Sequence, residues 1–338
     1  MLIIAVFKLS CNHRLISGKI LKYCSQIVIY IGIEMGRGKF SKLAYIFFSF
    51  FLALGLAFSF SACTPEEEES GKVGVVVTVL PQAEFVENVG GERVRVTVMV
   101  PPGASPHTYE PKPAQMTALA EAEIYAKVGS GVEFELVWME KLVATNKNLA
   151  VVNCSEGVEL QEMMAEDEND EDDEHPGRMD PHIWMSPVNA RIMVSNICDG
   201  LIAVDPESRG YYEQNRDAYL QQLAEIDREM RDGLAGVKNR RFMVYHPAFG
   251  YFAREYNLTM IPLEKEGKEP TAAGLAHMIE QARIYDIRVI FAEPQFDPKS
   301  AEVIASAIEG RVVLIDPLAK DYIGNLRIIL NEMLPAME

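Results

Sequence analysis

The spacing of apolar residues after position 72 predicts alternating strands and helices. Arg93–Val100 alternates polar and apolar residues one by one, which is typical of a half-buried strand. Val73–Leu80 is a short β-branched run and also predicts a strand. The first half adds strands at Ile124–Val128 and Leu149–Val152 and helices at Ala83–Val89, after Pro113, and at Phe134–Val143. Strands that alternate with helices indicate parallel βα units and an α/β fold.

The second half repeats this alternation after one long amphipathic helix. Arg209–Leu234 carries an apolar stripe at helical spacing, formed by Tyr212, Tyr219, Leu223, Ile226, Met230 and Leu234. A helix of this length between two βα regions can act as a stiff connector, although a plain surface helix would show the same pattern. Beyond it we expect strands at Phe242–Tyr245, Met260–Ile261, Val289–Phe291 and Val312–Ile315, and helices at Thr271–Tyr285, Pro298–Ile308 and Asn325–Met333.

The first 62 residues have the pattern of a leader. From Met35 the chain reads MGRGKFSK, then an apolar run, then SAC ending at Cys63, which predicts a signal peptide with a lipidation site at that cysteine. We expect Met35 to be the natural start and residues 1–34 to be upstream sequence translated by mistake. Residues 63–72 would form a lipid-anchored tether. The alternative is a membrane-spanning helix over Leu43–Ala62, which is long enough to cross.

Charge and cysteine content narrow the classes of partner and site. The chain of 338 residues has a formal net charge of −17, which argues against nucleic acid and anionic membrane surfaces as partners and suits a cationic ligand. Glu166–Glu174 holds eight acids in nine residues and is followed by His175, so residues 166–175 should form a solvated loop. The five cysteines include no CxxC pair, which excludes a thiolate zinc site. Outside the cell Cys154 and Cys198 could pair or stay reduced.

Three histidines share one local setting. His107, His182 and His246 each adjoin a proline, so they lie in stiff turns, and two of them follow predicted strands. Asp316 likewise follows a predicted strand and precedes Pro317. Ligands of open α/β sheets bind at the carboxyl ends of strands. A single histidine beside a proline is usually a loop residue, but three imidazoles and a carboxylate together match tetrahedral Zn²⁺.

Four stretches that contain these residues resemble a known family. They are PPGASPHTYEP at 101–111, DPHIWMSP at 180–187, YHPAFGYF at 245–252 and IDPL at 315–318. In this order and spacing they are similar to the zinc/manganese solute-binding lipoproteins of ABC importers, the ZnuA/TroA-like group. KEPTAAGLAHMIE at 268–280 and VIFAEPQF at 289–296 extend the resemblance over nearly all of 72–334.

The resemblance implies a fold of two parallel-sheet α/β lobes, with the metal in the cleft between them. The N-terminal lobe would span 73–208, the connecting helix 209–234 and the C-terminal lobe 235–338. The implied metal ligands are His107, His182, His246 and Asp316, with Glu293 as a candidate partner that orients a ligand imidazole.

The implied function is to carry an ion to the permease of an ABC importer. Relatives tuned to manganese tend to have a carboxylate where this chain has His246, so zinc is favoured and manganese is the alternative. We expect a monomer outside the cytoplasm, anchored to the outer face of the cell membrane or periplasmic, and no enzymatic activity. An extracellular zinc hydrolase and a metal-stabilised adhesin are less favoured readings. No HExxH motif supports the hydrolase.

Overall fold

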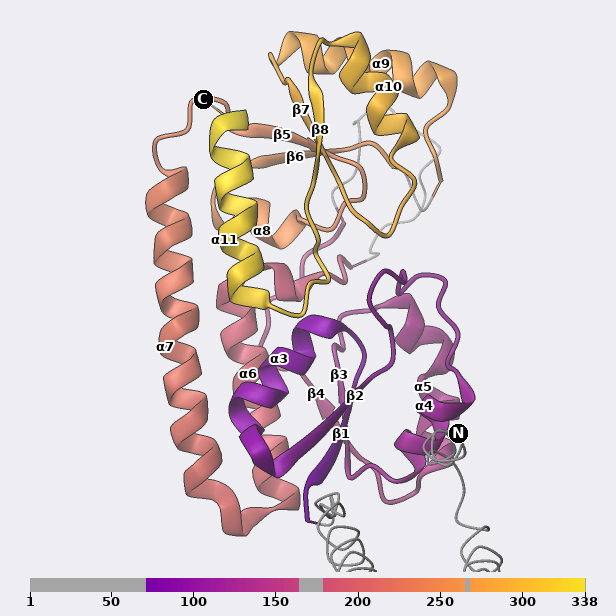
Figure 1. Ribbon diagram of the computed structural model, residues 1–338, viewed down its shortest axis with the longest axis vertical. Helices are drawn as coiled ribbons and strands as arrows, with labels where there is room; N and C mark the ends of the chain where they lie inside the picture. The colour runs from indigo at the N-terminus through magenta and orange to yellow at the C-terminus, as the bar shows by residue number, and fades with distance from the viewer. Residues whose placement is uncertain (1–70, 164–178, 265–267, 338) are drawn as a thin grey trace, which may run out of the picture. The chain divides into compact units, whose positions relative to one another are not determined.

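The computed structural model describes residues 71–163, 179–264 and 268–337 (Figure 1). The predicted leader, Cys63, and the acidic run with His175 lie outside these residues. Within the described part of the chain, no helix is long and apolar enough to cross a membrane.

The N-terminal lobe is built on a four-stranded parallel sheet. Its strands, β1 (Val73–Val77), β2 (Val94–Val98), β3 (Ile124–Lys127) and β4 (Ala150–Asn153), lie in the order β2-β1-β3-β4. Its helices are α3 (Leu80–Gly90), α4 (Pro113–Ala120), α5 (Glu133–Thr145) and α6 (Pro187–Val204). The β-branched run of β1 is buried at the centre of this sheet, because a strand with neighbours and helices on all sides needs apolar residues on both faces.

The C-terminal lobe repeats the same strand order. Its strands are β5 (Arg241–Val244), β6 (Thr259–Pro262), β7 (Val289–Ala292) and β8 (Arg311–Leu314), in the order β6-β5-β7-β8. Its helices are α8 (Gly250–Glu255), α9 (Ala272–Ile284), α10 (Lys299–Ala307) and α11 (Tyr322–Met333). The equivalent order means that in each lobe the loops after the first and third strands meet at one edge, which is where a ligand can be held.

The long helix α7 (Arg209–Leu234) joins the two lobes. It packs against α3 and α6 of the first lobe and against α11 of the second (Figure 1). Its buried residues are those of the predicted stripe. The two-lobe α/β fold with one connecting helix is therefore confirmed, and α7 is more than a plain surface helix because it packs on both lobes.

One element of the core was not expected from the sequence, and one question that the sequence left open is answered. Helix α6 was not anticipated, although Ser186 caps it by accepting a hydrogen bond from the backbone N–H of Asn189 and Pro187 occupies its first turn. Cys154 and Cys198 are both buried and free, so they form no disulfide. Burial raises the pKa of the Cys154 thiol to about 12, and this side chain packs as a small apolar group near Gln82.

Candidate metal centre

Three loops bring the histidines to one point between the lobes. His107 lies in the proline-rich loop between β2 and α4, and His182 directly precedes a short 3₁₀ turn at Ile183–Met185. His246 follows β5 by two residues. Adjacent prolines restrict each backbone, so the imidazoles are held by stiff turns.

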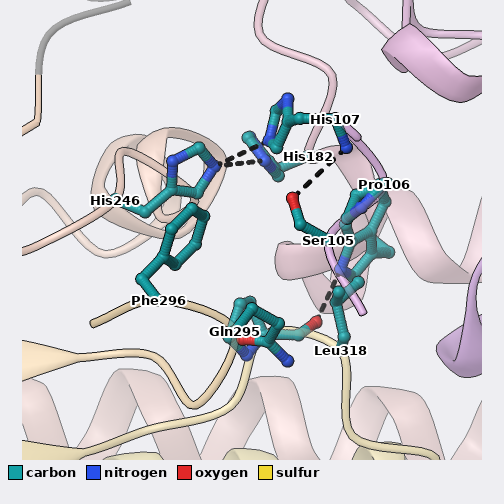
Figure 2. Close-up of a pocket in the computed structure, with 10 residues that line it drawn as sticks. Ser105, Pro106, His107, His182, His246, Gln295, Phe296 and Leu318 are labelled. Carbon is teal, nitrogen blue, oxygen red and sulfur yellow. Dashed lines mark hydrogen bonds between the residues drawn. The ribbon is translucent and has the colours of Figure 1, made fainter. Parts of the chain in front are cut away.

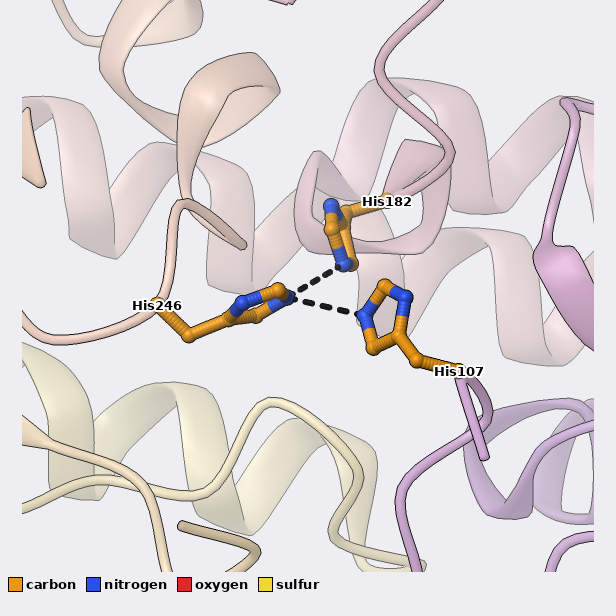
Figure 3. A group of neighbouring side chains, drawn as sticks. All are labelled: His107, His182 and His246. Atoms are coloured by element: carbon orange, nitrogen blue, oxygen red, sulfur yellow. Dashed lines mark hydrogen bonds between the residues drawn. The ribbon is translucent and has the colours of Figure 1, made fainter. Parts of the chain in front are cut away.

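The Nε2 atoms of the three rings converge (Figure 3). His246 Nε2 lies 3.1 Å from His107 Nε2 and 3.2 Å from His182 Nε2. One ring nitrogen from each residue lies within 4.8 Å of the others, and among the described residues this is the group that could hold a metal ion. Two nitrogens bound to one tetrahedral Zn²⁺ at 2.0–2.1 Å would lie about 3.3 Å apart, so the two spacings from His246 Nε2 are close to those of a zinc site.

Each imidazole has a carboxylate at its other nitrogen. His182 Nδ1 is 2.8 Å from Asp180 Oδ1, and His246 Nδ1 is 3.1 Å from Glu264 Oε2. His107 Nδ1 lies 2.8 Å from Glu133 Oε2. The contacts of His182 and His246 are hydrogen bonds, and because a carboxylate can only accept, they place the ring proton on Nδ1 and leave the Nε2 lone pair available to a metal. Glu133 Oε2 lies at ion-pair distance from His107 Nδ1 and favours a proton there by its charge.

A bound cation would stabilise this arrangement of the three imidazoles. Which of the Nε2 atoms can donate depends on the tautomer of each ring. With every ring proton on Nδ1, His246 Nε2 faces the other two Nε2 atoms, 3.1 and 3.2 Å away, lone pair to lone pair. This arrangement is repulsive in the absence of a positive charge. Neutral imidazole is the form that binds Zn²⁺, and the carboxylates behind the rings increase the basicity of the ligands. The centre therefore has the chemistry of a site that binds a divalent metal of borderline softness.

Aromatic and apolar residues surround the centre (Figure 2). The Phe296 ring stacks on His246 with a centroid distance of 4.7 Å and an interplanar angle of 26°. The side chain of His107 is 25% exposed, whereas those of His182 and His246 are 4% and 6% exposed. The site is thus reached from the side of His107. The pocket is lined by Ser105, Pro106, His107, His182, Trp184, His246, Gln295, Phe296, Pro317 and Leu318.

Asp316 departs from the four-ligand expectation. It is not a member of the group formed by the three histidines. Its Oδ1 instead accepts hydrogen bonds from Gln295 Nε2 at 2.7 Å and from the backbone N–H of Leu318 at 2.9 Å. The second bond closes an Asx turn, which is common chemistry for an aspartate before a proline. A direct role of Asp316 in binding stays a prediction.

Glu293 also has a different partner from the one expected. Its Oε2 accepts a hydrogen bond from the backbone N–H of His246 at 3.2 Å, and the imidazole is oriented by Glu264 instead. Burial raises the pKa of Glu293 well above its usual value. Glu293 therefore fixes the backbone that carries His246.

The sequence does not predict the carboxylates that contact the imidazoles, which belong to Glu133, Asp180 and Glu264. Asp180 precedes His182 by two residues, and Glu264 follows the end of β6 by two, so both had a positional signal. Glu133 begins α5 and had no such signal, because its contact with His107 depends on how the loop of His107 packs against the start of that helix. Because the chain has many other acidic residues, these three do not stand out in the sequence.

The burial of His246 makes the stability of the folded protein depend on pH. Burial, as the largest cause, lowers the pKa of His246 to about 4, despite the hydrogen bond to Glu264, which raises it. The unfolded chain, with a histidine pKa of about 6.5, binds more protons between these two values, so stability falls as the pH drops from about 6.5 toward 4. We expect His246 to account for a loss of about 2 kcal/mol between pH 7 and pH 5.

Urea unfolding of the metal-free protein at both pH values measures this loss. In His246→Gln the decrease in unfolding free energy should be smaller than in the unaltered protein by that amount. Equal decreases would contradict the prediction. His277→Gln is the matched control, because His277 is exposed on α9.

Comparison with known proteins assigns the family. Residues 75–335 match the family described as zinc-uptake complex component A, periplasmic, and the chain belongs to this family. The high-affinity zinc uptake system protein ZnuA of Bacillus subtilis is 29% identical over 257 residues, which cover 75% of this chain and 80% of that protein.

Solved structures agree with this assignment. A crystal structure of ZnuA is 40% identical, with a TM-score of 0.74, and the match covers 79% of this chain and 100% of that one. The Zn(II)-bound ZnuA-like domain of Streptococcus pneumoniae AdcA is 25% identical, with a TM-score of 0.66, over 79% of this chain and 99% of that domain. Against the whole zinc-binding lipoprotein AdcA of that species, at 28% identity over 80% of this chain, the match covers 55% of AdcA. These relatives are named as metal-binding or uptake proteins and not as enzymes.

Proposed function

We propose that this protein binds one zinc ion as cargo, through Nε2 of His107, His182 and His246, and delivers it to the permease of an ABC importer. The observation that carries the proposal is the convergence of three Nε2 lone pairs, each backed by a carboxylate at Nδ1. The names of the relatives supply the transport role. The boundaries proposed for the lobes are 73–208 and 235–338, joined by residues 209–234.

Zinc is favoured over manganese by the donor atoms. Imidazole nitrogens suit zinc, whereas carboxylate, carbonyl and water oxygens suit manganese. His246 supplies nitrogen at the position where manganese-tuned relatives tend to have a carboxylate. The ligand set among the described residues is therefore made of nitrogen alone.

A role in binding is favoured over hydrolysis by the surroundings of the ion. Three histidines leave one zinc position open, as catalytic sites do. A hydrolase also needs a general base beside the bound water. The lining of the pocket contains no aspartate or glutamate, and Glu133, Asp180 and Glu264 each contact a ligand imidazole from behind.

We further propose that the protein acts as a monomer outside the cytoplasm, held at the outer face of the membrane by a lipid on Cys63. The leader pattern and the AdcA lipoproteins among its relatives support the anchor. Mass spectrometry of protein from a membrane fraction, in which the N-terminal peptide begins at acylated Cys63, would test it. An N-terminal peptide that retains the leader would contradict it.

A metal titration tests the function itself. The metal-free protein should bind one Zn²⁺ per chain in calorimetry, and elemental analysis of protein purified without added metal should find zinc. Competition with Mn²⁺ should leave zinc bound. A stoichiometry near zero would overturn the proposal. Preferential retention of manganese would indicate that manganese, and not zinc, is the cargo.

A further inference from the structure

A hydrogen bond between Gln295 and Asp316 lies at the edge of the metal centre. Gln295 lies in the loop between β7 and α10 and lines the same pocket as the three histidines (Figure 2). Its Nε2 donates to Asp316 Oδ1 at 2.7 Å. The bond therefore joins a pocket residue to the carboxylate that the sequence suggested as a fourth ligand.

Asp316 is fixed in this position by several bonds. The backbone N–H of Leu318 donates to the same Oδ1 at 2.9 Å, and Asn325 Nδ2 donates to the Asp316 carbonyl at 2.7 Å. The next carbonyl, that of Pro317, accepts from Trp184 Nε1 at 2.8 Å. The loop is thus tied to α11 and to the N-terminal lobe, and the carboxylate has donors without any metal.

The orientation of the Gln295 side-chain amide is fixed by its hydrogen bond to Asp316. Its Oε1 is buried and has no hydrogen-bond partner among the described residues. Turning the amide over would place that oxygen against the Asp316 carboxylate, so the observed orientation is the one in which Nε2 donates. A buried acceptor without a partner is unfavourable, which indicates that the contact with Asp316 dominates the placement of Gln295.

We propose that Gln295 determines metal specificity by holding the Asp316 carboxylate away from the three imidazoles. The inference rests on the proposed zinc-binding function and deepens it. With Asp316 bound to Gln295, the protein offers nitrogen ligands only, which suit zinc. A released carboxylate would add a hard oxygen donor and improve the site for manganese.

Replacement of the amide tests the proposal. In Gln295→Leu, Asp316 loses one donor, and the preference for Zn²⁺ over Mn²⁺, measured on the full chain by competition titration, should fall by roughly tenfold or more, the size of effect that outer partners of ligands usually have. Asp316→Asn in that background should restore the preference. Asp316→Asn alone should leave zinc affinity near that of the unaltered protein.

A spectroscopic readout separates this role from a structural one. Co²⁺ bound to the unaltered protein should give a visible spectrum that Asp316→Asn does not change. Co²⁺ bound to Gln295→Leu should give a shifted spectrum, which Asp316→Asn reverses. Gln281→Leu is the matched control, because Gln281 contacts His277 on α9 away from the pocket. Gln295→Met, which keeps the length of the side chain, replaces the leucine variant if that one does not fold.

Two results would overturn the inference. One is an unchanged zinc-over-manganese preference in a Gln295 variant that still binds one zinc. The other is a loss of zinc affinity in Asp316→Asn as large as that in His107→Ala, which would make Asp316 a ligand in the unaltered protein. Failure of the unaltered protein to bind zinc would instead refute the proposed function, and the first titration reveals this.

Discussion

Zinc affinity should fall by more than a hundredfold in His107→Ala, measured by competition with a chelating dye. The variant removes one of three ligands, and loss of a ligand should exceed the 10–100-fold cost of losing an outer partner. His107 is the best residue for this test because its side chain is 25% exposed, so its removal should leave the fold intact. Glu133→Gln keeps the imidazole but weakens its orientation, and it should cost roughly 10–100-fold.

The control for this pair is His277→Ala. His277 is exposed on α9 and lies outside the group of converging histidines, so zinc affinity should be unchanged. Unfolding in urea should be similar in all these variants. If His107→Ala bound zinc as tightly as the unaltered protein, the ligand assignment would be wrong. If Glu133→Gln were neutral, the carboxylate behind the ring would have no role in binding.

Zinc should raise the thermal midpoint of unfolding strongly. A ligand that binds only the folded state contributes about 4 kcal/mol at a free concentration 1,000 times its dissociation constant. At about 2–4 °C for each kcal/mol in a chain of this size, the midpoint should rise by roughly 8–16 °C. Calorimetry or circular dichroism in zinc buffers measures the shift, and a chelator should reverse it.

The metal-free protein should nevertheless remain folded. One buried apolar cluster includes residues of both lobes and of α7, and a second lies in the C-terminal lobe, so the core does not depend on a metal. A carrier has to fold without its cargo. Unfolding on removal of zinc would instead indicate a structural metal, as in the adhesin alternative. The triple variant His107→Ala, His182→Ala, His246→Ala is the control and should show no shift with zinc.

Much of the fold was predictable because its signals are local. The β-branched run at β1 and the apolar stripe of α7 follow from side-chain period alone. Helix α6 is not among the elements expected from the sequence, although Ser186 and Pro187 form a normal helix start. The equivalent order of the two sheets was not visible in the sequence, because strand order depends on contacts between residues far apart in the chain.

The site was predictable only in part, for a related reason. The prolines beside His107, His182 and His246 mark stiff turns, and the sequence alone pointed to these residues. The hydrogen bond that draws Asp316 to Gln295 joins residues 21 positions apart. The contact between His107 and Glu133 joins a loop to the start of α5. Such pairings are set by packing, so the sequence suggested an aspartate near the centre without indicating its partner.

Hydrogen bonds between the two lobes bear on how much metal binding can change the molecule. Trp184 Nε1 donates to the Pro317 carbonyl, and the Tyr322 hydroxyl donates to the Trp184 carbonyl. On the side of α8, the Tyr251 hydroxyl donates to the Asp180 carbonyl. None of these bonds involves a metal, so we expect them to hold the lobes together on two sides in the metal-free protein as well. In the proposed carrier role, an ion would therefore be expected to change the histidine-bearing loops more than the arrangement of the lobes.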